Sequence, residues 1–84
     1  MRLERLEEPL GWVEARFEKG AISPLRFKWR HREFAVTATH ARWVDRETRP
    51  IRWSFSVSVS TGEVYELCHR EGDPVWYVTG IMTE

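Results

Sequence analysis

A strict alternation of apolar and polar residues runs through nine positions, Ile51-Arg52-Trp53-Ser54-Phe55-Ser56-Val57-Ser58-Val59. A period of two is typical of a β-strand with one buried face, because successive side chains point to opposite sides. The next three residues, Ser60-Thr61-Gly62, predict a hairpin loop with its glycine in the left-handed conformation. This loop sets the register of the following strand, with the pairs Val57–Tyr65, Phe55–Leu67 and Trp53–His69.

The same alternation appears on both sides of this stretch. Further strands are expected at 12–18, 25–30, 33–44 and 75–82. A two-residue loop at His31-Arg32 keeps the large apolar residues on one side, with the pairs Trp29–Phe34, Phe27–Val36 and Leu25–Ala38. Residues 45–50 read as a charged loop. Residues 1–9 place leucines at near-helical spacing, which leaves either one helical turn or a mobile tail.

Short strands at regular spacing without a long helix predict an all-β fold. We expect a five- or six-stranded antiparallel meander, either a small SH3-like barrel or a strongly curved sheet. Residues 11–84 are expected to form a single β domain, and residues 1–10 a short N-terminal tail.

Composition limits the class of protein. The chain has 84 residues, of which 42% are hydrophobic, and its five tryptophans can supply a core. No apolar run approaches the ~18 residues that a membrane helix needs, and the first residues lack a signal peptide's apolar core. A single cysteine cannot form an internal disulfide, so the expected location is the cytoplasm.

Charge is unevenly distributed although the net charge is zero. Residues 25–53 hold eight cations and three anions, a net +5, and residues 54–84 carry a net −4. Alternate residues of a strand lie about 6.6 Å apart, close to the spacing of successive phosphates. This pattern favours a non-catalytic module that binds DNA or RNA; the alternative is a basic face that only keeps the protein soluble. The candidate phosphate-binding residues are Arg26, Lys28, Arg30, Arg32 and Arg52.

A second set of residues suggests a surface for a protein partner. Arginine and tryptophan are enriched at interfaces, and they cluster around the charged loop. The candidates are Arg42, Trp43, Arg46, Arg49 and Trp53. The serine-rich strand at 51–59 is a further candidate, as an edge that accepts another strand. Such a module is a monomer or a homodimer. The opposing interpretation stacks these arginines on tryptophan or pairs them with Asp45 and Glu47.

The sequence gives little support for a catalytic site or a metal site. Cys68 and His69 are adjacent on a strand and face opposite sides, and no Cys-x-x-Cys or His-x-x-x-His pair is present. The serines have strand spacing, with no nucleophile elbow or phosphate-binding glycine loop. We therefore expect no enzymatic activity, no metal and no cofactor.

The segment Pro24-Leu25-Arg26-Phe27-Lys28-Trp29-Arg30-His31-Arg32-Glu33-Phe34-Ala35-Val36 resembles a small bacterial family of unknown function. That family carries a Pro-x-Arg-Phe-x-Trp-Arg-Gly-Arg-x-Tyr-x-Val core, and its closing Val-Tyr-Glu-Leu matches residues 64–67. Some of its members are fused to polymerase-like proteins of the ImuB type, so the resemblance implies a bacterial protein in the neighbourhood of DNA repair. The family's hairpin glycine is His31 here and its tyrosine is Phe34, so a role carried by the turn tip does not transfer.

Overall fold

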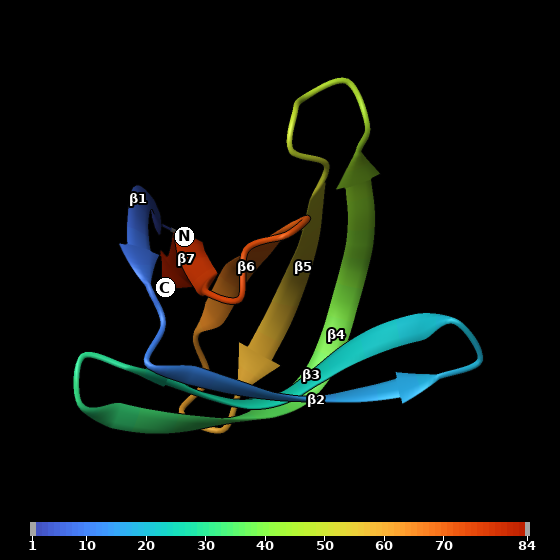
Figure 1. The fold of residues 1–84 in the computed structure, drawn as a ribbon. Helices are drawn as coiled ribbons and strands as arrows, with labels where there is room; N and C mark the ends of the chain where they lie inside the picture. Colours follow the sequence, from blue (N-terminus) through green and yellow to red (C-terminus); the bar gives the residue numbers. More distant parts are fainter. Residues whose placement is uncertain (1, 84) are drawn as a thin grey trace.

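A computed structural model describes residues 2–83, and all regular structure in that range is β-strand. The strands are β1 (Arg2–Pro9), β2 (Trp12–Glu18), β3 (Ala21–Trp29), β4 (Arg32–Asp45), β5 (Arg52–Val59), β6 (Val64–Arg70) and β7 (Trp76–Thr83). They form one antiparallel sheet in the order β1-β7-β6-β5-β4-β3-β2 (Figure 1). The predicted all-β antiparallel fold is confirmed, and the predicted number of strands is wrong, because there are seven.

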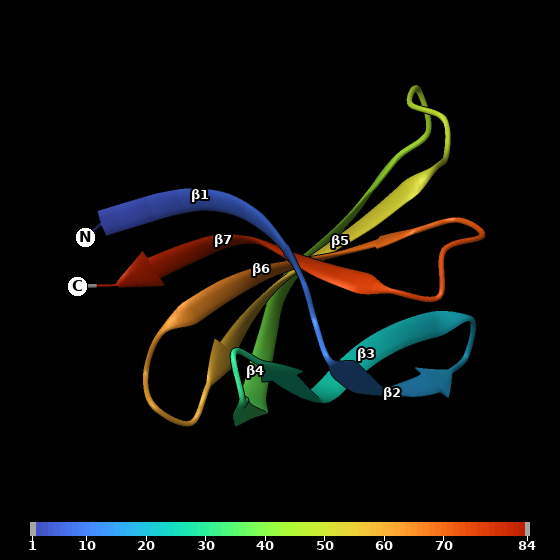
Figure 2. The ribbon, with the colours of Figure 1, turned by 60° about the vertical axis from the view of Figure 1, so that its left-hand side comes forward.

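The sheet bends at β4, which is shared between two neighbours. Its first four residues pair with β3, and the stretch from Val36 to Asp45 pairs with β5. That second stretch has register irregularities between Val36 and Ala38 and between Thr39 and Ala41. Bulges of this kind bend a strand and increase its twist. The β2–β3 and β4–β5 hairpins therefore project from the body in different directions (Figures 1 and 2).

The two outermost strands of the sheet, β1 and β2, are consecutive in the chain. The amide of Leu10, between them, donates to the Trp76 carbonyl at 2.8 Å, and the amide of Gly11 donates to the Lys28 carbonyl at 2.8 Å. The junction is thus bonded to both ends of the sheet. No ladder joins β1 to β2 within residues 2–83, so the sheet is not closed and the predicted barrel is wrong.

Residues 2–9 form strand β1, where the sequence predicted a helical turn or a tail. They pair with β7, with Arg2 opposite Thr83. Leu3 and Leu6 are three positions apart, so plain alternation puts them on opposite faces of the strand. Leu6 consequently packs against the core while Leu3 is exposed. The inner face of β1 carries Glu8 beside Leu6, so it lacks the apolar alternation that marks a strand in the sequence.

The core lies on the inner face of the curved sheet, where the sheet's two ends approach each other. Phe27 stacks on Phe34 with ring centroids 5.2 Å apart, and Tyr65 meets Phe27 edge-on at 5.5 Å. Such aromatic pairs stabilise a core beyond the area they bury. The buried cluster comprises Leu10, Phe27, Trp29, Phe34, Phe55, Val57, Val59, Tyr65, Leu67 and Val78.

One predicted hairpin register is confirmed and the other is wrong. The pairs of β5 and β6 are the predicted ones, and Gly62 has a φ of 101°. In the β3–β4 hairpin Phe27 lies opposite Phe34, so the turn residues are Arg30 and His31 and not His31 and Arg32. Both have positive φ, 51° and 66°, as the tight turn that best fits twisted strands requires.

Candidate binding cleft

A gap opens between β3 and β4 beyond their last shared pair, Arg26 and Ala35. From there β3 pairs only with β2, and β4 pairs only with β5. Both strands therefore turn an unpaired edge toward the gap over the described residues. An unpaired edge presents free backbone N–H and C=O groups, which makes it a template for another strand.

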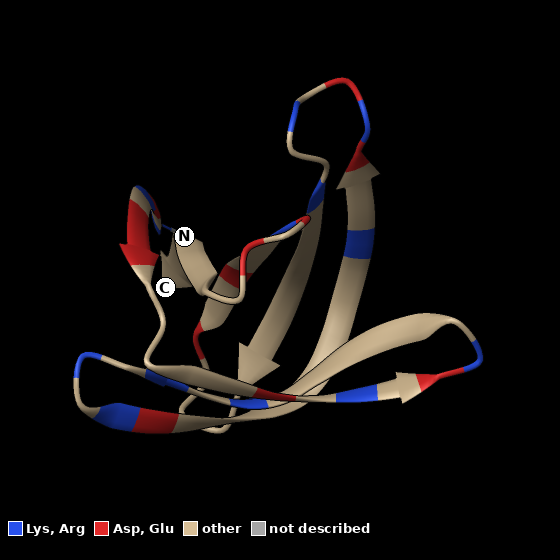
Figure 3. Cartoon of the chain, viewed as in Figure 1, with Lys and Arg blue, Asp and Glu red and all other residues tan. Residues whose placement is uncertain are grey.

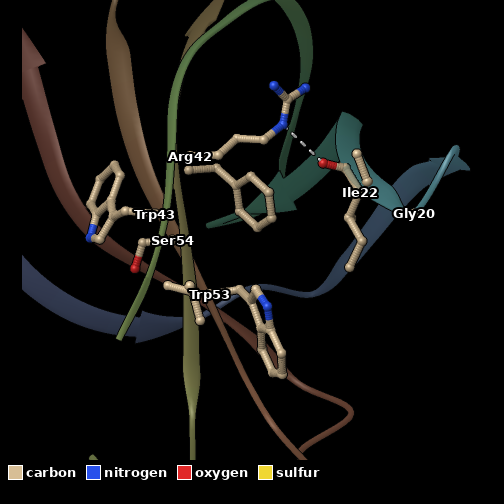
Figure 4. Close-up of a pocket in the computed structure, with 9 residues that line it drawn as sticks. Gly20, Ile22, Arg42, Trp43, Trp53 and Ser54 are labelled. Atoms are coloured by element: carbon tan, nitrogen blue, oxygen red, sulfur yellow. Dashed lines mark hydrogen bonds between the residues drawn. The ribbon is translucent and has the colours of Figure 1, made fainter. Parts of the chain in front are cut away.

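Apolar side chains line the floor and both walls of this gap, which we call the inter-hairpin cleft. Its volume is about 270 Å³. The side chains that matter below are Ala21, Ile22, Arg42, Val44, Trp53 and Phe55 (Figure 4). Phe17 lies directly opposite Ile22 in the β2–β3 pair and thus on the same face, and 76% of it is exposed. The inner faces of both hairpins thus carry exposed apolar residues, Phe17 on one and Val44 on the other, while Phe55 is buried.

One side chain crosses the cleft. The Arg42 Nε donates to the Ile22 carbonyl at 3.3 Å (Figure 4). Its Nη2 donates to the Ser23 hydroxyl at 2.8 Å. The Ile22 carbonyl therefore points into the gap. A side chain occupies the place that a backbone partner takes elsewhere in the sheet.

A row of stacked rings supports the cleft floor. His69 lies between Trp53 and Trp76, with centroid distances of 5.9 and 5.0 Å, and Trp76 stacks on Phe55 at 5.4 Å. The Nδ1 atom of His69 is buried and has no hydrogen-bond partner among the described residues. Stacking on His69, which is itself held by Trp76, positions the Trp53 ring at the cleft.

The structure brings only part of the predicted basic face together. Arg26 and Lys28 share the outer face of β3. Arg26 pairs with Glu33 at 2.9 Å, and Lys28 has no carboxylate within ion-pair distance among residues 2–83. Glu14 lies opposite Arg26 on β2 and adds a second carboxylate to this face. The face thus carries both signs of charge, as do the ends of both hairpins (Figure 3).

Arg30, at the turn, is held by Glu8 of β1. Its Nε and Nη2 donate to the two carboxylate oxygens at 3.0 and 2.6 Å, and Trp29 Nε1 donates to the same group at 3.0 Å. The hydrogen bonds from Arg30 are the main reason that the pKa of Glu8 is lowered, and the same contact raises the pKa of Arg30. This cation is therefore committed to a carboxylate.

The other two predicted phosphate ligands lie elsewhere. Arg32 is opposite the inward-facing Trp29, and its guanidinium lies 5.2 Å from the Phe34 ring centroid. Arg52 is on β5, where its contact with the Cys68 side chain is the main cause of a raised pKa of the guanidinium. Neither residue joins the outer face of β3.

The predicted protein-binding surface is divided as well. Trp43 is paired with Ser54 and Val44 with Trp53, and since neighbouring pairs alternate between faces, Trp43 and Trp53 point to opposite sides (Figure 4). The Arg49 side chain donates back to carbonyls of its own loop, those of Arg46 and Thr48. The serine-rich strand is β5, which has neighbours on both sides, so its prediction as an edge is wrong.

Two exposed aromatic residues were missed at the sequence level. Trp12 is 39% exposed and lies opposite Lys28, and Phe17 projects from the β2–β3 hairpin. Alternation marked Phe17 as inward-facing, but only the open β3–β4 gap reveals that nothing covers it. No cluster of His, Cys, Asp and Glu suited to a metal occurs in residues 2–83, and no helix in that range is long and apolar enough to cross a membrane.

Comparison with known proteins adds no relative. No protein-family model matches the chain, no curated protein sequence matches it, and no solved structure matches it. The chemistry of the cleft must therefore be argued from its own residues.

Proposed function

We propose that the chain is a non-catalytic interaction module whose inter-hairpin cleft accepts an extended segment of another polypeptide. The observation that carries this proposal is the pair of unpaired edges of β3 and β4 beside the exposed apolar side chains of Phe17 and Val44. An entering strand would pair with the free backbone groups and place alternate side chains on Ile22 and Trp53. A nucleic acid lacks the regular N–H and C=O groups that such an edge pairs with.

The resemblance of residues 24–36 to the repair-associated family adds a place to look for the partner. Proteins of DNA repair in a bacterial cytoplasm are the first candidates under this proposal. Under the same proposal the module has no enzymatic activity and is either a monomer or a homodimer. Sedimentation of the free protein tests the oligomeric state.

A charge placed in the cleft should weaken binding. We expect a random-peptide display library to yield peptides that bind the wild-type protein. Val44→Asp should weaken them by about tenfold or more, because the new carboxylate would be desolvated by an apolar side chain. Fluorescence anisotropy of a labelled selected peptide measures the affinity.

The matched control is Val75→Asp. Both valines are 37% exposed, and Val75 lies in the turn before β7, outside the cleft. This variant should bind as the wild type does. A library that enriches no peptide over a blank surface, or equal loss in both variants, would refute the cleft as the binding site.

A second candidate function, nucleic-acid binding, rests on the exposed indole of Trp12 beside Lys28. These two side chains border a surface hollow of about 400 Å³ together with Arg30 and His31. An exposed ring next to an unpaired cation can stack a base and contact a phosphate. The carboxylates of Glu8, Glu14 and Glu33 around it make this candidate the weaker one.

Titration with labelled single- and double-stranded DNA at low and moderate salt tests it. If the hollow binds nucleic acid, Lys28→Glu should reduce the slope of log affinity against log salt by about one, since one phosphate contact is lost. The control is Lys19→Glu, in the turn between β2 and β3, because it changes the net charge equally at a position outside the hollow. Absence of binding at low salt eliminates this candidate.

A further inference from the structure

The side chains of the cleft specify its ligand more closely than the unpaired strand edges do. Its volume of about 270 Å³ lies below the roughly 300–1,000 Å³ of pockets for drug-sized ligands. Trp53, Phe55 and Ile22 line it with aromatic and aliphatic carbon. A space of this size and lining suits one large apolar side chain.

Arg42, at the rim of this space, makes no ion pair, in contrast to four other arginines of the described residues. The guanidinium groups of Arg5, Arg26, Arg30 and Arg70 each lie within 3.0 Å of a glutamate oxygen. Arg42 has no carboxylate within ion-pair distance among residues 2–83. Its contacts are a carbonyl and a hydroxyl, which engage two of its five N–H groups.

The nearby carboxylate of Asp45 does not form an ion pair with Arg42. Asp45, on the same strand, accepts the backbone amide of Glu47 at 3.0 Å and belongs to the loop. A strand that paired with the β3 edge would compete for the Ile22 carbonyl and release Arg42. A free guanidinium beside an apolar pocket binds a carboxylate best, since the two planar groups match in a bidentate pair.

We infer that the polypeptide accepted by this cleft carries a large apolar side chain, aromatic by preference, next to an aspartate or glutamate, and that Arg42 selects the carboxylate. This inference rests on the proposed function and adds the class of ligand. The apolar residue fills the space between Trp53 and Ile22. The acidic residue takes the Arg42 guanidinium in place of the Ile22 carbonyl and the Ser23 hydroxyl.

Parallel selections from one random-peptide display library test this inference. The baits are the wild type, Arg42→Gln and the control Arg46→Gln, which removes a cation from the same hairpin outside the cleft. Wild type and Arg46→Gln should enrich peptides with an aromatic residue adjacent to Asp or Glu. Arg42→Gln should keep the aromatic preference and lose the acidic one.

Titration of a selected peptide gives the magnitude. Replacing its acidic residue with the isosteric amide should weaken binding to the wild type by about tenfold, the usual value of a charge-assisted hydrogen bond, and leave binding to Arg42→Gln unchanged. Peptides that bind through the cleft with no acidic preference would overturn this inference and leave the proposed function standing. A library that yields no binder overturns both.

Discussion

Phe27→Ala should unfold the protein at a much lower temperature than any surface substitution. Phe27 is fully buried and contacts the rings of Phe34 and Tyr65. Truncating a buried phenylalanine costs about 3–5 kcal/mol, from lost transfer energy and from the cavity left behind. In a domain of this size each kcal/mol lowers Tm by roughly 4–8 °C. Thermal and urea denaturation followed by tryptophan fluorescence measure the loss.

The control is a second phenylalanine in the same hairpin. Phe17 is 76% exposed, so Phe17→Ala should change the free energy of unfolding by no more than about 0.5 kcal/mol. The two variants remove the same atoms and differ in burial alone. Equal losses in both would contradict the placement of Phe17 outside the buried core.

His69→Phe should stabilise the protein. The phenyl ring can keep the stacking between Trp53 and Trp76, and it removes an Nδ1 atom that is buried without a partner. An unsatisfied buried polar atom costs about 1–3 kcal/mol, so a gain of about 1 kcal/mol or more is expected. The free energy of unfolding, from urea denaturation at neutral pH, measures it.

A second substitution at this position separates the effect of ring stacking from the effect of the buried Nδ1 atom. His69→Gln keeps polar atoms and loses the ring, so it should be less stable than the wild type. A loss of stability in His69→Phe would mean that Nδ1 makes a favourable hydrogen bond in solution. That result would contradict the prediction that Nδ1 is a buried atom without a hydrogen-bond partner.

Alternation predicted the strands because each has one buried face. The register of β5 and β6 followed from loop length, since Gly62 supplied the left-handed residue that the loop needs. The β3–β4 register could not be predicted from the turn sequence, because Arg30 and His31 are unusual residues at positive φ. Their turn is supported by Glu8, on a strand that the sequence did not reveal.

Two local features account for the remaining differences in the fold. The inward-facing Glu8 hid the alternation of β1, and a bulge at Leu25 leaves Pro24 buried in its place. Local periodicity cannot locate such a bulge, because it exchanges the two faces. Of the candidate site residues, Arg42, Trp43 and Trp53 line the cleft, but the cleft itself depends on where β3 and β4 separate.

The pairing of β1 with β7 has a consequence for how the protein is made. A ribosome delivers β1 first, yet its partner strand is the last of the seven to emerge. Until then the backbone groups of β1 have no ladder, because β7 is its one neighbouring strand in the sheet of residues 2–83. Contacts between such distant segments slow folding, because a long chain must be ordered before they form. The nascent chain should therefore remain sensitive to proteases until β7 has left the exit tunnel, and then become resistant in a single step.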